Sequence, residues 1–511
     1  MNHLACLLKD VSFRKEFQFH PRCKCLRFQH LTFADDLLLF AKADLPSLSL
    51  FKADLIEFAH VLGLQLNLDT SQIFFRNVSG EAKRTITRLL GIHEGRFPVR
   101  YLGIPLLASR LSHMDCKVLV DKLMGRTTSW LSNSLSFGGR LQLLASVLFS
   151  IQVFWCSTFV LPVAVTKECD RILKSFLWHG VGNSKKGGKV VWSKVCSPKE
   201  EGGLGIKDAR SWNRPAIMKI GWDICQRKGS VWTNWCYDIL LKIKHFWAAP
   251  ITGACSWSWR NILRTREVMI HKVLYEVKDD NLFSLWYDPW FMGASIVDKF
   301  GTTVIQDSRI PRDAKVNSVI SESKWNWPKN SWDLIQISYF TVDLPLQTCS
   351  DMIHWMKKGS TFSLHEAWRA FIPYSPIVSW SKVVWFSRRI PKHSFCLWLT
   401  FRDGHKTLDK LHSWGVVQSI SCAFRCGQEE SIDHLFFACP FTATIWNHFL
   451  AKCGFRMSYE GWFVESDWCI QSLQGNSFRS WITKLTLATV MYHCWMEHNN
   501  RFFQNSFRNR Y

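Results

Sequence analysis

Two adjacent aspartates, Asp35 and Asp36, stand inside an apolar stretch and are the first residues that could do chemistry. Phe33 precedes them and Leu37 follows, and a buried carboxylate is costly unless it is paired or holds a metal ion. A strand-turn-strand hairpin would present both carboxylates at its tip. Such a tip suits Mg²⁺, which prefers oxygen ligands. The alternative is a solvated Asp-Asp turn between two strands.

A second set of chemical groups lies further along the chain, where Cys422, Cys426, His434 and Cys439 fall within 18 residues. Structural zinc prefers a closed tetrahedron of thiolates and imidazole, which a Cys-turn-Cys followed by a His/Cys pair supplies. The first spacing is Cys-x3-Cys, within the range that zinc tolerates. The pattern therefore predicts a structural Zn²⁺ site. The alternative is four side chains in a reduced core with no ion.

Several elements must position these groups. Up to about residue 80 the pattern predicts strands and a helix around the Asp-Asp hairpin, and helical patterns follow from Met114 to Phe176. From Trp257 to about Phe340 the apolar pattern shortens to strand-like pieces rich in Trp, Asp and Pro. Leu435 to Phe437 indicate the start of a helix or turn that packs on Trp446.

Composition limits the class of protein. The chain has 511 residues, of which 47% are hydrophobic, so it can bury several cores and is not a disordered chain. Lys and Arg total 64 against 41 acids, a net charge of +23, which favours contact with nucleic-acid phosphates or anionic surfaces. A merely soluble basic surface is the alternative. Most of the 27 tryptophans are expected to pack in cores, among them Trp212, Trp222, Trp232 and Trp235.

Cysteine usage and hydropathy predict the compartment. Eighteen cysteines in a large chain without a signal-peptide pattern do not suggest a disulfide scaffold, so we expect the reducing nucleus or cytoplasm. Leu141 to Val165 contains no charged residue and is long enough to span a bilayer. Polar residues dilute this stretch and Pro162 interrupts it. We therefore expect no membrane partner.

Three further motifs follow the hairpin in order: Gly63-Leu-Gln-Leu-Asn67, Tyr101-Leu-Gly-Ile-Pro-Leu106 and Leu135-Ser-Phe-Gly-Gly-Arg140. Together with Phe33-Ala-Asp-Asp36 they resemble the reverse transcriptases of plant non-LTR (LINE-type) retrotransposons. The resemblance runs nearly end to end, as far as Trp495-x-Glu-His-Asn499. It implies an α+β fold class, with a partial reverse-transcriptase palm, a helical thumb, a mixed middle region and a small zinc-binding α-rich module.

The resemblance also implies a division of the chain into five parts. We expect a palm remnant at 1–80, a mainly helical thumb and connection at 81–230, a Trp-rich mixed region at 231–345, the reverse-transcriptase zinc-binding domain at 346–450, and a C-terminal helical tail at 451–511.

The resemblance implies that Asp35 and Asp36 descend from a polymerase site. Two-metal phosphoryl transfer needs carboxylates from more than one strand, because both cations must be held roughly 3.5–4 Å apart. In the family the other essential aspartate lies on an earlier palm strand, and only 34 residues precede Asp35. We therefore expect that the fingers and the first half of the palm are missing, and that Asp35 and Asp36 are a remnant metal-binding pair.

Together these inferences predict a truncated reverse-transcriptase polypeptide. It would bind RNA and DNA of the template-primer type, hold structural Zn²⁺ and lack autonomous polymerase activity. The alternative is an active RNA-directed DNA polymerase that uses two Mg²⁺ ions, if the missing half of the palm is supplied.

Overall fold

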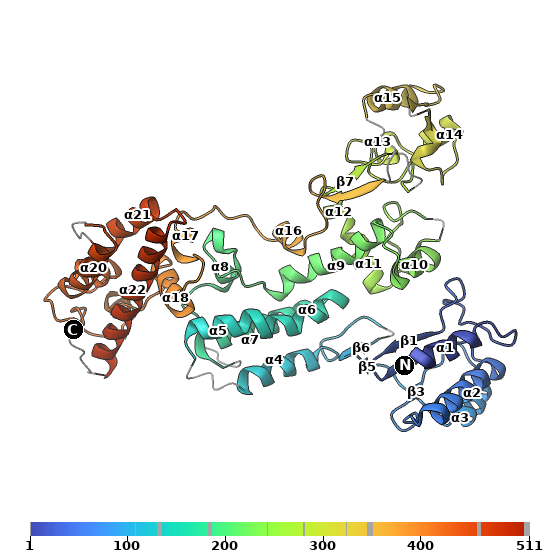
Figure 1. Cartoon of the computed structure of the whole chain (residues 1–511), viewed down its shortest axis with the longest axis horizontal. Coiled ribbons are helices and arrows are strands. Elements are labelled where there is room, and N and C mark those ends of the chain that lie inside the picture. The colour runs from blue at the N-terminus through green and yellow to red at the C-terminus, as the bar shows by residue number, and fades with distance from the viewer. Residues whose placement is uncertain are drawn as a thin grey trace. The chain divides into compact units, whose positions relative to one another are not determined.

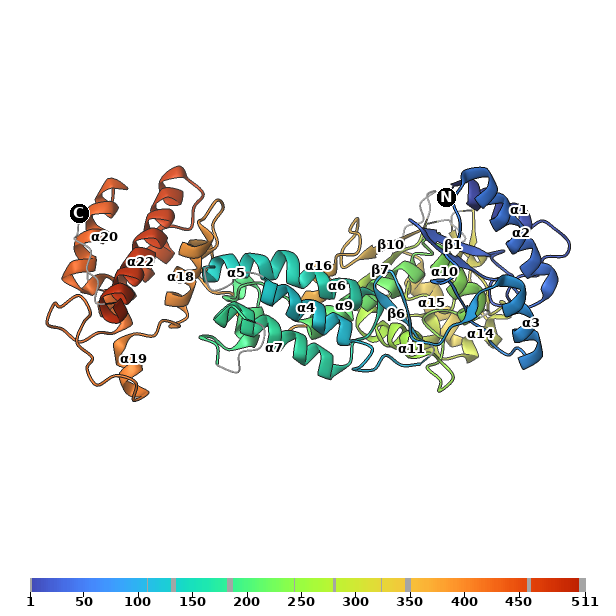
Figure 2. The same ribbon diagram turned by 90° about the horizontal axis from the view of Figure 1, so that it is seen from below.

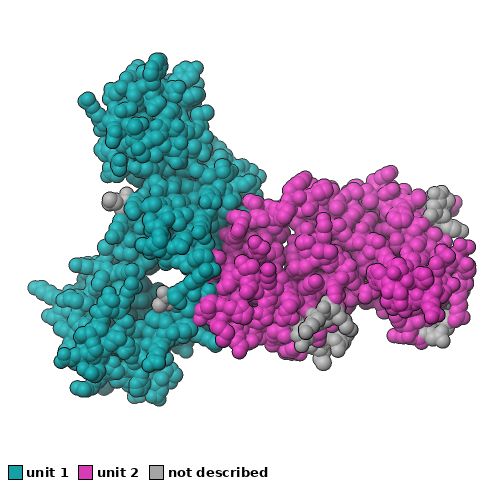
Figure 3. Space-filling model, turned by 180° about the vertical axis from the view of Figure 1, so that it is seen from behind, with its two compact units in different colours: residues 1–111, 216–367 teal, residues 112–215, 368–511 magenta. Residues whose placement is uncertain are grey.

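The computed structural model describes residues 2–107, 109–129, 135–181, 187–242, 244–278, 282–322, 324–344, 351–456 and 461–504. These residues form a mixed α and β structure in which about half of the chain is helical and each sheet has two strands (Figure 1). The chain divides into two compact units, Met1–Leu111 with Ala216–Ala367 and Ser112–Pro215 with Trp368–Tyr511 (Figure 3). Each unit combines two separate stretches of sequence. The division into five parts by motif stays a prediction.

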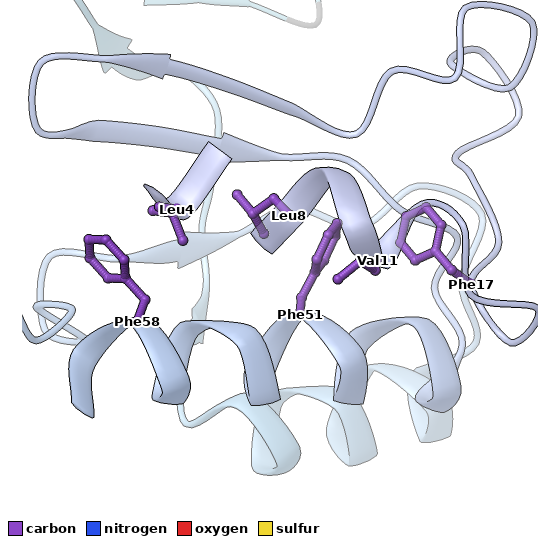
Figure 4. Close-up of a cluster of buried hydrophobic side chains, with 6 residues drawn as sticks. All are labelled: Leu4, Leu8, Val11, Phe17, Phe51 and Phe58. Carbon is purple, nitrogen blue, oxygen red and sulfur yellow. The ribbon is translucent and has the colours of Figure 1, made fainter. Parts of the chain in front are cut away.

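The N-terminal stretch of unit 1 folds around a small apolar core beside a β-hairpin. Strand β1 (His30–Phe33) pairs antiparallel with β2 (Asp36–Leu39), with Phe33 opposite Asp36. Helix α1 (Asn2–Val11) packs on α2 (Leu45–Leu62). The alternate residues Leu37 and Leu39 of β2 pack against the same core, since they lie on one side of the strand. The buried side chains of this core are Leu4, Leu8, Val11, Phe17, Phe51 and Phe58 (Figure 4).

Local sequence signals set the ends of helix α2. The Asp44 side chain accepts a hydrogen bond from the Ser47 backbone N–H at 2.9 Å, which caps the first turn. Gly63 ends the helix with φ +68°, a left-handed conformation that costs glycine little. The remaining elements of this stretch are β3 (Gln72–Ile73), α3 (Gly80–Leu90), β4 (His93–Glu94), β5 (Val99–Tyr101) and β6 (Ile104–Leu106).

The second stretch of unit 1 is richer in helix than the sequence pattern predicted. Between Trp257 and Phe340 the strand-like pieces are mostly short helices and loops, in which tryptophans such as Trp290, Trp325 and Trp327 pack on one another. The elements are α10 (Val231–Trp235), η4 (Cys236–Leu241), α11 (Trp257–Arg264), α12 (Arg266–Met269), β7 (Val273–Glu276), α13 (Ile296–Phe300), α14 (Thr303–Ser308), η5 (Val316–Val319), β8 (Ile320–Ser321), β9 (Lys324–Trp325), α15 (Trp332–Thr341) and β10 (Met352–Trp355).

Tryptophans fill much of this stretch, as the sequence predicted. Trp222 is buried and meets Trp355 edge-on at 5.6 Å between ring centroids. Trp290 stacks on Trp325 at 5.5 Å. Trp232 differs from the prediction: it is 44% exposed and stacks on Trp235 at the surface. The helical spacing of Trp232 and Trp235 alone did not reveal that no other described element covers Trp232.

The first stretch of unit 2 is a set of helices that lie side by side in both ribbon views (Figures 1 and 2). The helical pattern predicted from Met114 to Phe176 is confirmed for the residues described there. The elements are α4 (Lys117–Ser129), α5 (Phe137–Leu143), η2 (Leu144–Leu148), α6 (Phe149–Thr158), α7 (Val163–His179), α8 (Trp192–Cys196), η3 (Lys199–Glu201) and α9 (Ala209–Cys225), whose last residues belong to unit 1.

One helical stretch of the described residues, Phe137–Thr158, is long and apolar enough to cross a membrane by length and composition alone. A core helix of a protein outside membranes passes the same test. Leu144 and Leu148 are buried, whereas Ser146 and Ser150 are exposed one turn apart. A buried apolar stripe beside an exposed polar one is typical of a helix packed on neighbours, which here include α4, α7 and α18.

The second stretch of unit 2 is built around one long helix, α22 (Phe478–Gln504), which contacts both α18 and α20 (Figure 2). The loops between these helices carry the Cys/His cluster. The other elements are α16 (Leu364–Arg369), which begins in unit 1, then α17 (Ser381–Val384), α18 (Pro391–Phe401), α19 (Leu408–Ser413), η6 (His434–Ala438), α20 (Pro440–Lys452) and α21 (Trp462–Ser472).

Candidate metal centre

The structure brings Cys422, Cys426, His434 and Cys439 together, with one ligand atom of each within 4.8 Å of all the others. The Sγ atoms of Cys422 and Cys439 lie 3.9 Å apart, and the Cys426 Sγ lies 3.1 Å from the His434 Nε2. Around a tetrahedral zinc ion with Zn–S bonds near ~2.3 Å, two sulfurs would be about 3.8 Å apart. The donor set and its spacing therefore fit a structural Zn²⁺ ion.

A tight turn presents the first two cysteines. The Arg425 N–H donates to the Cys422 carbonyl at 2.9 Å, and the Phe424 N–H points at the Cys422 Sγ at 3.4 Å. Gly427, with φ +86°, then lets the chain return, so that the Cys422 N–H donates to the Gln428 carbonyl. This local hydrogen bonding accommodates the Cys-x3-Cys spacing.

A kinked turn presents the other two ligands. In η6, Phe436 and Phe437 leave helical geometry, and Phe437 has φ +87°. The kink places His434 and Cys439 on one side while the Phe437 ring stacks on Trp446 at 4.9 Å. The turn and its packing on Trp446 are confirmed.

The environment of Cys439 favours a thiolate. The residue caps the 13-residue helix α20, where backbone N–H groups of Phe441 and Thr442 face its sulfur. The hydrogen bond from the neighbouring Cys422 thiol is the largest of the effects that lower the pKa of Cys439. A thiolate is the form that binds zinc.

Glu430 and His498 anchor the ligand turns, and the sequence pattern did not single them out. Glu430 lies between the two ligand pairs, and its carboxylate accepts the Leu408 N–H at 2.9 Å and the Ala423 N–H at 3.3 Å. The His498 Nε2 lies 2.8 Å from the Glu430 Oε1. The one sequence signal was the Trp495-x-Glu-His-Asn499 motif, which contains His498.

Asp35 and Asp36 lie at the tip of the β1–β2 hairpin, so the predicted hairpin is confirmed. Ala34 adopts φ +50° in the turn, and both aspartates are exposed and not buried. Tyr101, of the Tyr-Leu-Gly motif, lies near Asp36. Burial raises the pKa of Tyr101, and the negative charge of the Asp36 carboxylate raises it further. Within the described ranges, the Cys/His cluster is the one place where three or more metal-binding side chains come together. No third metal-binding side chain of those ranges therefore joins Asp35 and Asp36. Mg²⁺ binding stays a prediction.

The fold and this site define a helical module with a four-ligand Cys/His centre. Residues 362–446, which contain all four ligands, match the family described as zinc-binding in reverse transcriptase. The match supports structural zinc at these residues.

Two Arabidopsis thaliana proteins are similar to the chain. One, named "Putative ribonuclease H protein", is 29% identical over 367 residues, which cover 67% of this chain and 57% of that protein. The other, named "Uncharacterized mitochondrial protein", is 26% identical over 149 residues, which cover 28% of this chain and 94% of that protein. With the family match, they confirm the resemblance drawn from the motifs: the chain is related to the C-terminal region of plant retrotransposon reverse transcriptases.

Proposed function

We propose that this chain is a retroelement polypeptide that binds RNA and DNA, holds a structural zinc ion and lacks autonomous polymerase activity. The observation that carries the proposal is the Cys/His centre inside the residues that match the reverse-transcriptase zinc-binding family. One relative is named a putative ribonuclease H protein, and ribonuclease H is an enzyme that acts on nucleic acid.

Charge supports the nucleic-acid part of the proposal. The net charge is +23, and exposed cations stand without acidic partners on helix α4. Lys122 and Arg126 lie one turn apart there, and neither forms an ion pair within the described parts of the chain. Cations on an exposed helix face can contact phosphates and release counterions.

The hairpin supports a palm origin for the N-terminal stretch of unit 1, and the helices α4 to α7 support a thumb. Asp35 and Asp36 are adjacent in sequence, and both are exposed at the tip of the hairpin. A two-metal centre needs further carboxylates, and none gathers with these two among the described residues. The second candidate function, an RNA-directed DNA polymerase with two Mg²⁺, therefore requires that another segment supply the rest of the palm.

Fluorescence anisotropy of the full chain with labelled RNA and DNA tests the binding proposal. We expect affinity that depends little on sequence and falls steeply between about 50 and 200 mM salt. Affinity at low salt no better than that of a neutral control protein would contradict the proposal.

A primer-extension assay tests the catalytic part. With Mg²⁺ or Mn²⁺, we expect the purified chain to incorporate no deoxynucleotides on a primed template. Incorporation that disappears in the Asp35→Ala variant would show instead that the pair is an active site.

A further inference from the structure

Unit 2 contains a cavity of about 840 Å³ that is separate from the Cys/His centre. Its walls come from Leu135–Gly138 at the start of helix α5, Lys189, helix α18, residues 405–417 and the C-terminal end of helix α22. The volume falls in the range of ligand sites in proteins. One or two unstacked nucleobases would fit in it, whereas a duplex would not.

The cavity has a strong excess of positive charge. Lys189, Lys392 and Lys406 line it, and the residues that line it include no Asp or Glu. None of the three lysines forms an ion pair with a carboxylate in the residues that the structure covers. Burial lowers the pKa of Lys189 to about 8, so this amine is still largely charged at neutral pH. An anion in the cavity would relieve this uncompensated charge.

Aromatic rings line the same cavity. Helix α22 supplies Tyr492, Trp495, Phe502 and Phe503, and Phe137 comes from the start of helix α5. Two of the lysines already lie near these rings: the Nζ of Lys189 is 4.8 Å from the Phe137 centroid, and that of Lys392 is 5.1 Å from the Tyr492 centroid. Flat rings beside cations match a ligand that has both a π-face and a negative charge.

His405 adds an unused hydrogen-bonding group. Its side chain lines the cavity and is 1% exposed, and its Nδ1 has no hydrogen-bond partner. The Nε2 lies 3.0 Å from the Thr400 Oγ1 and 3.2 Å from the carbonyl oxygen of Cys396. A buried ring nitrogen without a hydrogen-bond partner is costly, and a ligand that reached it would offset that cost.

We propose that this cavity binds a phosphate-bearing nucleobase, with the base among the α22 rings and the phosphate near the lysines. The proposal deepens the nucleic-acid binding proposed above and rests on it. Two sources share this chemistry: an unpaired nucleotide of single-stranded RNA or DNA, and a free nucleotide.

Photocrosslinking of the full chain tests the site. The probes are a single-stranded oligonucleotide that carries 5-iodouracil and, in a parallel arm, the corresponding mononucleotide. We expect the oligonucleotide to crosslink to peptides that contain Tyr492, Trp495, Phe502 or Phe503. The mononucleotide arm decides whether a single free nucleotide suffices for binding.

Variants at exposed cavity residues avoid unfolding the protein. Lys392 and Lys406 are exposed, and Phe503 is 68% exposed. The triple variant Lys392→Gln, Lys406→Gln and Phe503→Ala should lose the crosslink and bind the oligonucleotide roughly tenfold or more weakly. Its slope of log affinity against log salt should become shallower by about 1.4, because two phosphate contacts are lost.

Two controls separate the site from general charge. Phe478→Ala removes an exposed aromatic at the other end of α22, where Phe478 is 76% exposed, and should leave the crosslink and the affinity unchanged. Lys122→Gln with Arg126→Gln removes the same charge from α4 and should retain the crosslink even where the affinity falls.

The outcomes distinguish the two proposals. Binding with crosslinks elsewhere, and unchanged in the triple variant, would overturn the cavity site and leave nucleic-acid binding standing. No oligonucleotide binding at low salt would overturn the proposed function. In that case a mononucleotide crosslink in the cavity would keep the site as a nucleotide site, and no crosslink would overturn it as well.

Discussion

The His498 Nε2 lies 2.8 Å from the Glu430 Oε1, and both side chains are almost completely shielded from solvent. Glu430 belongs to the chain segment between the Cys426 and His434 ligands, whereas His498 lies on helix α22. The pair therefore ties the ligand turns to the long helix. The same carboxylate oxygen holds the first N–H of helix α19, at Leu408.

The His498→Ala variant should be strongly destabilised. The change removes the hydrogen bond between His498 and the buried Glu430 carboxylate, a loss of about 1.5–3 kcal/mol in the free energy of unfolding. Urea unfolding measures this loss of stability. The control His448→Ala removes an exposed histidine on α20 and should change stability by less than about 0.5 kcal/mol. Equal effects of the two substitutions would contradict a structural role for the pair.

Metal analysis of the native protein should find about one zinc per chain, held by three thiolates and one imidazole. Cys426→Ser with Cys439→Ser should abolish the zinc and lower the melting temperature. The matched control is Cys453→Ser, because Cys453 follows helix α20, outside the cluster, and its Sγ lies near Thr486. The zinc assignment fails if native protein contains no metal or if the double variant retains it.

Two glycine substitutions should change the stability of the protein in opposite directions. A Cβ at Gly138 would lie 2.7 Å from the backbone N of Lys392, so Gly138→Ala forces α5 away from α18. We expect a loss of about 1–3 kcal/mol. Gly125, within helix α4, has nothing within 4 Å of its added Cβ, so Gly125→Ala should stabilise by up to ~1 kcal/mol. Thermal unfolding of both variants measures the difference, and two changes of one sign would contradict the close approach of α5 and α18.

Acid should destabilise the protein through His393. Burial lowers the pKa of His393 from 6.5 to about 4, with a further contribution from the charges of His493 and Lys392. The unfolded chain takes up this proton near pH 6.5 and the folded chain does not. The stabilising contribution is therefore complete above pH 6.5 and is lost as the pH falls towards 4.

Urea unfolding of wild type and of His393→Phe between about pH 7 and pH 5 measures the pH dependence of stability that His393 causes. Wild type should lose up to about 1.4 kcal/mol per pH unit more than the variant. Loss of zinc at low pH affects both proteins alike, so the difference isolates His393. Parallel pH profiles would show that His393 titrates normally in the folded protein.

Features set by nearby residues could be predicted from the sequence. The Asp35-Asp36 hairpin and the helices between Met114 and Phe176 are present where the patterns placed them. The four Cys/His ligands come together because they are close in sequence and short turns suffice to gather them. Even there, the pattern could not say that Asp35 and Asp36 are exposed, since exposure depends on what packs beside the hairpin.

Contacts between distant segments were decided only by the tertiary structure. Glu430 meets His498 across 68 residues, and Gly138 meets Lys392 through backbone atoms that no residue pattern specifies. The same holds for the short helices between Trp257 and Phe340 and for the exposed Trp232. The sequence by itself determined the chemistry of the Cys/His centre and the related family. The tertiary structure decided what anchors that centre and which cations and rings share a cavity, because periodicity marks an apolar face without saying which other face it will meet.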